Sequence, residues 1–162
     1  MKYKVAILLA THNGEKYLHQ QISTILSQYG VYVHVYCSDD YSQDRTVEIL
    51  EGFNSKYENF EILSKNKKFG GAGLNFYHLI RNVSLTGYDY VAFADQDDIW
   101  FPNKLLDAIE EMKVSNAHGF SSDVFTYWGE GVNRIKHMKK SYDQTQYDHL
   151  FESPGPGCSQ LI

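Results

Sequence analysis

The sequence lacks the features that mark membrane, secreted and nucleic-acid-binding proteins. Its 162 residues include two cysteines, Cys37 and Cys158, which are too few for a disulfide framework and suit a reducing compartment. No apolar run approaches the roughly 20 residues that span a bilayer, and the N-terminus, "MKYKVAILLATHNGE", does not resemble a secretory signal. The net charge of −5 argues against a basic nucleic-acid surface. We therefore expect a soluble cytoplasmic protein that binds no nucleic acid.

The usual phosphate-binding loops are also absent. The sequence contains no G-x-x-x-x-G-K-[ST] loop, and "FGGAG" (69–73) does not match a G-x-G-x-x-G turn after a strand. An acidic protein does not attract a polyanion by its overall charge. If the ligand carries phosphates, a bound cation is the better account of how they are neutralised.

Short apolar runs alternate with stretches of helical periodicity along one domain-sized chain, which is 43% hydrophobic and 22% charged. The runs predict strands, and the periodic stretches predict helices. The order is strand 3–10, helix 15–28, strand 31–38, helix 44–57, strand 60–64, helix 73–83, strand 88–94 and helix 102–114. This alternation predicts an α/β fold with a mostly parallel sheet and helices on both faces.

The pattern changes in the last third of the chain. Residues 119–128, "GFSSDVFTYW", predict a fifth strand, whereas 129–162 show no firm periodicity. The basic run at 134–140 is interpreted as a solvated face, with contact to acceptor phosphates or anionic lipid as the alternative. We expect one domain, 1–162, with a regular core at 1–128 and a less regular region at 129–162.

A polar cluster follows each of the first four predicted strands. In a parallel sheet these clusters lie along the carboxyl edge, where open α/β sheets bind ligands. Loop and helix-cap preferences explain any one cluster alone; Ser42 or Asp44, for example, could cap the second helix. Four clusters in register favour a ligand site. They are "THNG" (11–14), "SDD" (38–40), "SKN" (64–66) and "DQDD" (95–98).

The "DQDD" cluster needs a positive partner, because neighbouring carboxylates in a low-dielectric site oppose each other's ionisation. Lys104 is the nearest basic residue in sequence, and a divalent metal is the other candidate. If the strand continued, Asp95 and Asp97 would share one face and Asp98 would turn away. Two carboxylates with open positions suit Mg²⁺ or Mn²⁺ bridging to a diphosphate.

Two other features near this cluster have ordinary structural interpretations. Asp98 is interpreted as a turn residue, or as a residue that contacts the metal ligands rather than the metal. Trp100 and Phe101 are read as a packing pair that anchors the loop, with sugar stacking as the alternative. The histidines lack metal-ligand spacing with cysteine, so a zinc site is not expected.

These motifs together resemble the family 2 glycosyltransferases with the GT-A fold. The blocks that carry the resemblance are "LLATHNGEKYLHQQISTILSQ", "CSDDYSQDRTVEIL", "NKKFGGAGLNFYHLI" and "FADQDDIWFPNKL". The last block is most similar to the bacterial rhamnosyltransferase branch, which decorates cell-surface polysaccharide. His12 stands where relatives often carry an aromatic residue.

The resemblance implies roles for particular residues. Thr11, Asn13 and Glu15 would lie around the nucleoside, and Asp39 would bind the pyrimidine base. The remaining residues would serve the rest of the nucleotide sugar: Asn66, Gly70 and Gly71 in the nucleotide pocket, Asp95 and Asp97 as the D-x-D that faces ribose and metal, and Lys104 near the sugar or phosphate.

The implied reaction is inverting sugar transfer from a UDP- or TDP-linked donor, with Mn²⁺ or Mg²⁺ as cofactor. The acceptor would be a saccharide or a lipid-linked molecule, with peripheral membrane contact as an added expectation. A carboxylate base would deprotonate the acceptor. We expect this base beyond Ile162, since "PGPGCSQLI" resembles the turn and strand start that precede it in relatives. The chain would then be the donor-binding part of a longer enzyme, with a nucleotide-binding core at 1–128 and the incomplete start of an acceptor-side region at 129–162.

Two other functional classes remain open. A non-catalytic module that binds nucleotides or sugars would need the same strand-end residues. A nucleotidyltransferase is also α/β and metal-dependent, but it usually has a glycine-rich basic loop after its first strand, where this chain has "THNGEKY".

Overall fold

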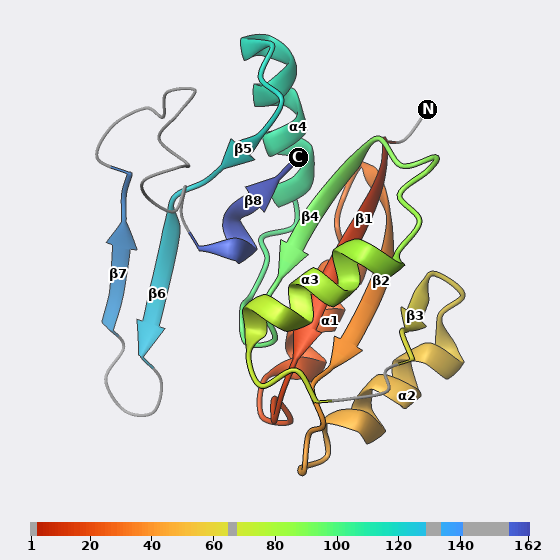
Figure 1. Ribbon diagram of the computed structural model, residues 1–162. Helices are drawn as coiled ribbons and strands as arrows, with labels where there is room; N and C mark the ends of the chain where they lie inside the picture. The colour runs from red at the N-terminus through yellow and green to blue at the C-terminus, as the bar shows by residue number, and fades with distance from the viewer. Residues whose placement is uncertain (1–2, 65–67, 129–133, 141–155) are drawn as a thin grey trace.

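The computed structural model describes residues 3–64, 68–128, 134–140 and 156–162 (Figure 1). Its centre is a six-stranded sheet with the order β3-β2-β1-β4-β8-β5. The first four strands are parallel and match the predicted ones, although β3 stops before Ser64. They are β1 (Tyr3–Thr11), β2 (Val31–Asp39), β3 (Phe60–Ile62) and β4 (Tyr90–Ala94).

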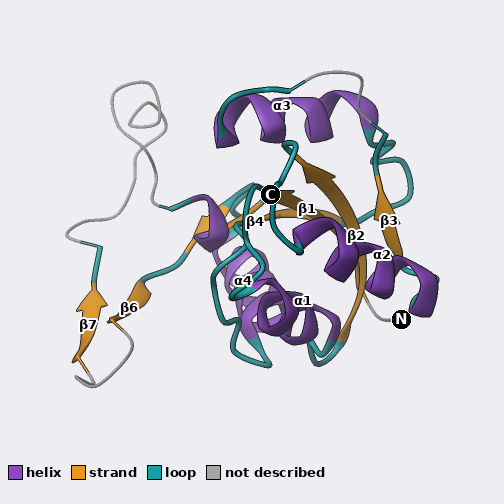
Figure 2. Ribbon diagram, turned by 90° about the horizontal axis from the view of Figure 1, so that it is seen from below, coloured by secondary structure: helices purple, strands orange, loops and turns teal. Residues whose placement is uncertain are grey.

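Helices cover both faces of this sheet, which confirms the predicted fold class. Figure 2 shows α3 on one side of the strands and α1, α2 and α4 on the other. All four helices occur where the periodicity predicts them, with ends shifted by a few residues. They are α1 (Leu18–Leu26), α2 (Thr46–Lys56), α3 (Ala72–Asn82) and α4 (Lys104–Ser115).

The central strand β1 explains why the sheet is covered on both sides. Val5, Ile7 and Leu9 pack into the larger core with α1, α2 and α4, whereas Leu8 packs into a smaller core with Leu79 of α3. All five side chains have no exposed surface. Because alternate residues of a strand point to opposite faces, a continuous apolar run requires burial on both. Each such side chain contributes about 1.5–3 kcal/mol of transfer free energy.

The prediction of one strand over 119–128 is wrong. The segment forms two strands, β5 (Phe120–Ser121) in the main sheet and β6 (Val124–Trp128) outside it. β6 pairs with β7 (Arg134–Met138) in a separate antiparallel ribbon beside the main sheet (Figure 1). The break falls at Asp123, whose carboxylate accepts a hydrogen bond from the Lys140 backbone N–H at 2.9 Å. This contact closes the ribbon at its base.

The C-terminal segment returns to the main sheet. A single 3-10 turn, η2 (Gly157–Ser159), leads into β8 (Gln160–Leu161), which lies antiparallel between β4 and β5. Leu161 is buried in the larger core. The strand start predicted after the "PGPGC" turn is therefore confirmed, and it makes the sheet mixed. Within the described residues, none of the helices has the length and apolar character needed to cross a membrane.

Candidate functional site

The ends of β1, β2 and β4 bring three of the predicted polar clusters to one edge of the sheet. β1 pairs in parallel register with β2 up to Thr11 and Asp39, and with β4 up to Leu9 and Ala94. The chain order reverses between β1 and β4, which is where open α/β sheets form their ligand crevice. In the third predicted cluster, Asn66 lies outside the described residues.

Thr11 and Asp39 form one hydrogen-bonded unit at this edge. The Thr11 hydroxyl donates to Asp39 Oδ1 at 3.0 Å, and both side chains are almost fully buried. The Ser42 backbone N–H donates to Asp39 Oδ2 at 3.0 Å, and the Ser42 hydroxyl also donates to this carboxylate. The predicted contact between Asp39 and a pyrimidine base stays a prediction.

Asn13 and Glu15 are exposed and tie the loop after β1 to the start of α2. Asn13 adopts a left-handed backbone (φ 51°), and its side-chain oxygen accepts from the Gln43 N–H at 2.8 Å. One Glu15 carboxylate oxygen accepts from the Arg45 N–H at 2.8 Å. These contacts give both side chains a structural task at the place where the nucleoside is expected.

Asp40 organises the glycine loop before α3, and the sequence reasoning missed it. Its two carboxylate oxygens accept hydrogen bonds from the backbone N–H groups of Phe69, at 2.5 Å, and Gly70, at 2.7 Å. Gly70 has a φ of 82°, which favours glycine, and Gly71 is exposed beside it. The doubled aspartate in "SDD" was the available signal.

The "DQDD" loop differs from the predicted geometry. β4 ends at Ala94, so the strand does not continue and the argument from alternating faces does not apply. Asp95 and Asp98 are the pair that converges, and Asp97 is exposed. The expectation that Asp98 turns away from Asp95 is therefore wrong. The metal-ligand roles of Asp95 and Asp97 stay predictions.

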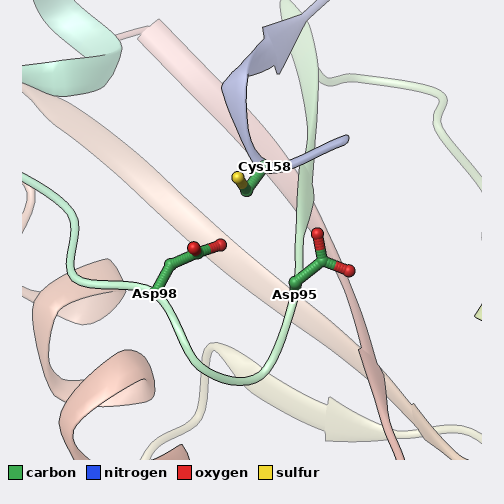
Figure 3. Close-up of side chains that lie close together, drawn as sticks. All are labelled: Asp95, Asp98 and Cys158. Carbon is green, nitrogen blue, oxygen red and sulfur yellow. The ribbon is translucent and has the colours of Figure 1, made fainter. Parts of the chain in front are cut away.

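Cys158 completes this cluster from the far end of the chain (Figure 3). Ligand atoms of Asp95, Asp98 and Cys158 all lie within 4.8 Å of one another. The Cys158 backbone N–H hydrogen-bonds to Asp95, and its thiol hydrogen-bonds to Asp98. Burial, followed by the charge of Asp98, raises the pKa of Cys158 to about 12, so the thiol stays protonated and can donate. Sequence reasoning had no local signal for this contact.

The two carboxylates are costly to ionise where they lie. Burial raises the pKa of both Asp95 and Asp98 above the ordinary value. The charges of Asp98 and Asp97 raise the pKa of Asp95 further, whereas the hydrogen bond from Cys158 partly offsets the rise at Asp98. Asp98 Oδ2 is buried and finds no hydrogen-bond partner among the described residues. Carboxylates that repel one another, with one oxygen unpaired, fit a hard divalent cation such as Mg²⁺ or Mn²⁺.

Lys104 is the basic neighbour of this cluster. Burial lowers its pKa, while the charge of Asp98 acts in the opposite direction. Its Nζ lies 4.3 Å from the ring centroid of Trp100, a cation–π contact. The predicted packing role is confirmed for Trp100, which is buried in the larger core, and is wrong for Phe101, which is 68% exposed.

The late aspartates offer no ready acceptor base within the described residues. The Asp123 carboxylate lies within hydrogen-bond distance of His137, with 2.8 Å between Oδ2 and Nε2. The hydrogen bond from the Lys140 backbone N–H is the main factor that lowers the pKa of Asp123, which makes its carboxylate a weaker base. Asp143 and Asp148 lie outside the described residues.

The sequence matches the family model described as "Glycosyl transferase family 2" over residues 6–159. This match spans nearly the whole chain. The chain belongs to glycosyl transferase family 2. The resemblance seen in the motifs is thereby confirmed.

Two curated relatives of the chain are bacterial sugar transferases. The chain is 43% identical over 155 residues to the dTDP-rhamnosyl transferase RfbG of Shigella flexneri, covering 95% of this chain and 53% of that protein. It is 28% identical over 166 residues to WfgD of Escherichia coli, a UDP-Glc:alpha-D-GlcNAc-diphosphoundecaprenol beta-1,3-glucosyltransferase, covering 99% of this chain and 60% of that protein. The chain thus spans about half the length of the curated relatives it matches.

Solved structures show the same fold. TarS 1–349 of S. aureus in complex with UDP-GlcNAc has a TM-score of 0.67 and 24% identity, covering 83% of this chain and 37% of that one. The mannosyltransferase PcManGT of Pyrobaculum calidifontis, in complex with GDP-Man and Mn²⁺, has a TM-score of 0.64 and 15% identity, covering 75% and 36%. These likenesses confirm a glycosyltransferase fold of the GT-A type.

Proposed function

We propose that this chain binds a nucleoside diphosphate sugar and forms the donor-binding part of an inverting glycosyltransferase, with TDP-rhamnose as the first donor to test. The observation that carries the proposal is the meeting of the Thr11–Asp39 unit and the acidic "DQDD" loop at one edge of the sheet. The 43% identity to a dTDP-rhamnosyl transferase supports the choice of donor. The acceptor is a saccharide or a lipid-linked molecule of a cell-surface polysaccharide.

In this proposal the loops after β1 and β2 hold the nucleoside. Thr11, Asn13 and Glu15 line one side, and Asp39 recognises the pyrimidine base. The hydrogen bonds from Thr11 and Ser42 hold the Asp39 carboxylate in one orientation before any ligand arrives. A preorganised acceptor costs less to fix on binding than a freely rotating one. Gly70, whose backbone N–H donates to the Asp40 carboxylate, Gly71 beside it, and Asn66 are assigned to the nucleotide pocket.

The diphosphate end lies at the "DQDD" loop. Asp95 and Asp97 are proposed to hold Mg²⁺ or Mn²⁺, with Asp98 beside them. A metal in this place would supply positive charge to a departing nucleoside diphosphate. Lys104 provides a second positive charge against Asp98, and its contact with Trp100 keeps it at the buried side of the loop. Asp95 and Asp98 must lose their protons for a cation to bind, which lower pH opposes.

Acceptor activation is proposed to require a carboxylate base that lies outside residues 1–162. The engaged Asp123 does not fit that role. We expect the enzyme to act in the cytoplasm, at the inner face of the membrane if its acceptor is lipid-linked.

A thermal-shift panel tests the proposal. TDP, TDP-rhamnose, UDP, GDP and ADP are compared in Mn²⁺, in Mg²⁺ and in EDTA. We expect the thymidine and uridine ligands to raise the Tm in the presence of metal more than in EDTA. Equal stabilisation by ADP, together with no effect of metal, would contradict the assigned site.

A further inference from the structure

Gln96 joins the two halves of the proposed site. Its side-chain oxygen accepts a hydrogen bond from the His12 backbone N–H at 2.7 Å, and its side-chain nitrogen donates to the His12 carbonyl at 2.9 Å. The amide therefore pairs with both backbone groups of a single residue, as a neighbouring strand would. While Asp95 and Asp98 on either side of it face Cys158, Gln96 reaches the loop after β1.

The bridge spans the point where the sheet would otherwise divide. β1 and β4 pair as far as Leu9 and Ala94. There β4 ends in the "DQDD" loop, whereas β1 continues beside β2 to Thr11 before its own loop begins. One of these loops carries the predicted nucleoside residues and the other carries the predicted metal ligands. Beyond the last backbone pair, the side chain of Gln96 connects the two loops by its hydrogen bonds to His12.

His12 carries the connection to the next strand. Its ring nitrogen Nδ1 lies 2.8 Å from the Asp40 carbonyl oxygen, at the end of β2. The Asp40 carboxylate in turn accepts the backbone N–H groups of the glycine loop. A continuous series of hydrogen bonds thus runs from the "DQDD" loop, through His12 and Asp40, to Gly70.

Gly14 leaves the space that this bridge occupies. A Cβ atom added at Gly14 would lie 2.5 Å from Gln96 Oε1 and 2.7 Å from Gln96 Cδ, closer than non-bonded atoms approach. Gly14 does not have the positive φ that only glycine favours, so its small size, rather than its backbone freedom, is what this site uses. Alanine at position 14 would displace a flexible amide and leave the backbone free to keep its course.

We propose that Gln96 is a positioning residue that couples metal binding to nucleotide binding across the β1–β4 junction. The inference rests on the proposed function and adds an energetic link between its two halves. A cation that orders the "DQDD" loop would, through Gln96, also order the loop that receives the nucleoside. By linkage, bound nucleotide raises the affinity for the metal by the same factor by which bound metal raises the affinity for the nucleotide.

Calorimetric titration with TDP, in saturating Mn²⁺ and in EDTA, measures this coupling. The coupling is the dissociation constant of TDP in EDTA divided by its dissociation constant in Mn²⁺. We expect Gln96→Ala to lower the ratio about three- to tenfold, the usual worth of one or two neutral hydrogen bonds. Gly14→Ala should lower it similarly, because it displaces the same amide. In the double variant the two effects should not add, because alanine at position 96 leaves room for the new methyl group.

Gly52→Ala is the control, since a Cβ there meets nothing within 4 Å, and it should leave the ratio unchanged. The Tm of each ligand-free variant shows that it is folded. Wild-type coupling that persists in both Gln96→Ala and Gly14→Ala overturns the inference alone. Failure of the wild-type chain to bind TDP overturns the proposed function and the inference with it.

Discussion

The thiol of Cys158, near the end of the chain, hydrogen-bonds to the carboxylate of Asp98 in the loop after β4. Cys158 lies in the 3-10 turn that leads into β8, and β8 pairs with β4, so the main sheet itself places the thiol over the acidic loop. The backbone N–H of the same residue donates a hydrogen bond to the carboxylate of Asp95. One residue from the last turn therefore holds both half-buried carboxylates of the cluster.

Removing the thiol should destabilise the acidic loop. Cys158→Ala deletes a donor to Asp98, and we expect a loss of about 1 kcal/mol in the free energy of unfolding. Cys158→Ser keeps a donor of similar size and should retain most of that stability. Urea unfolding in EDTA compares the two variants. Equal losses would show that the volume of the sulfur, and not its hydrogen bond, stabilises the loop.

Asp97 and Asp98 should differ in their effect on metal binding. Asp97→Asn removes the charge of an exposed predicted ligand and should abolish the Tm increase that Mn²⁺ adds in the presence of TDP. Asp98→Asn should reduce that increase less, because Asp98 already accepts the Cys158 thiol. A larger loss in Asp98→Asn than in Asp97→Asn would reassign the second metal ligand to Asp98.

The acidic cluster should make stability without metal depend on pH in an unusual direction. The folded-state pKa of Asp95 is raised, so the folded chain binds this proton more tightly than the unfolded chain does. Its contribution to stability therefore falls as the pH rises from the ordinary value of 3.8 through the raised pKa, and the penalty is complete above it.

Asp95→Asn isolates this effect from other acidic groups. At pH 7 in EDTA the variant should be more stable than wild type by about 0.5 kcal/mol, a modest gain because solvent screens a partly exposed group. The difference should vanish as the pH falls through the titration of Asp95. The same variant should lose Mn²⁺-dependent stabilisation. An Asp95→Asn variant that is less stable than wild type at pH 7 would contradict the assigned repulsion.

Asp40 should control the glycine loop. Asp40→Ala removes the acceptor for the Phe69 and Gly70 N–H groups, and we expect faster hydrogen exchange at both amides and about tenfold weaker TDP binding. Asp89→Ala is the matched control, because Asp89 accepts the Lys4 backbone N–H at 2.8 Å, away from the site. If both variants weaken TDP binding equally, the loss reflects general stability and not the loop.

Much of the fold and part of the site could be predicted from the sequence. A two-sided apolar strand such as "VAILLA" and the helical spacing of the stretches between strands are local patterns, and their alternation determines a parallel sheet. Because parallel strands end at a common edge, the meeting of Thr11, Asp39 and the "DQDD" loop follows from that order alone. The motif resemblance to the family was also visible before the structure.

The tertiary structure decided what depends on contacts between distant segments. No local pattern marks the break at Asp123 or the return of β8 beside β4. The conformation of the "DQDD" loop likewise depends on partners far away in sequence: Cys158 for Asp95 and Asp98, and His12 for Gln96. Side chains in a loop that has left its strand no longer alternate between faces, so hydrogen-bond partners supplied by other segments determine where each one points.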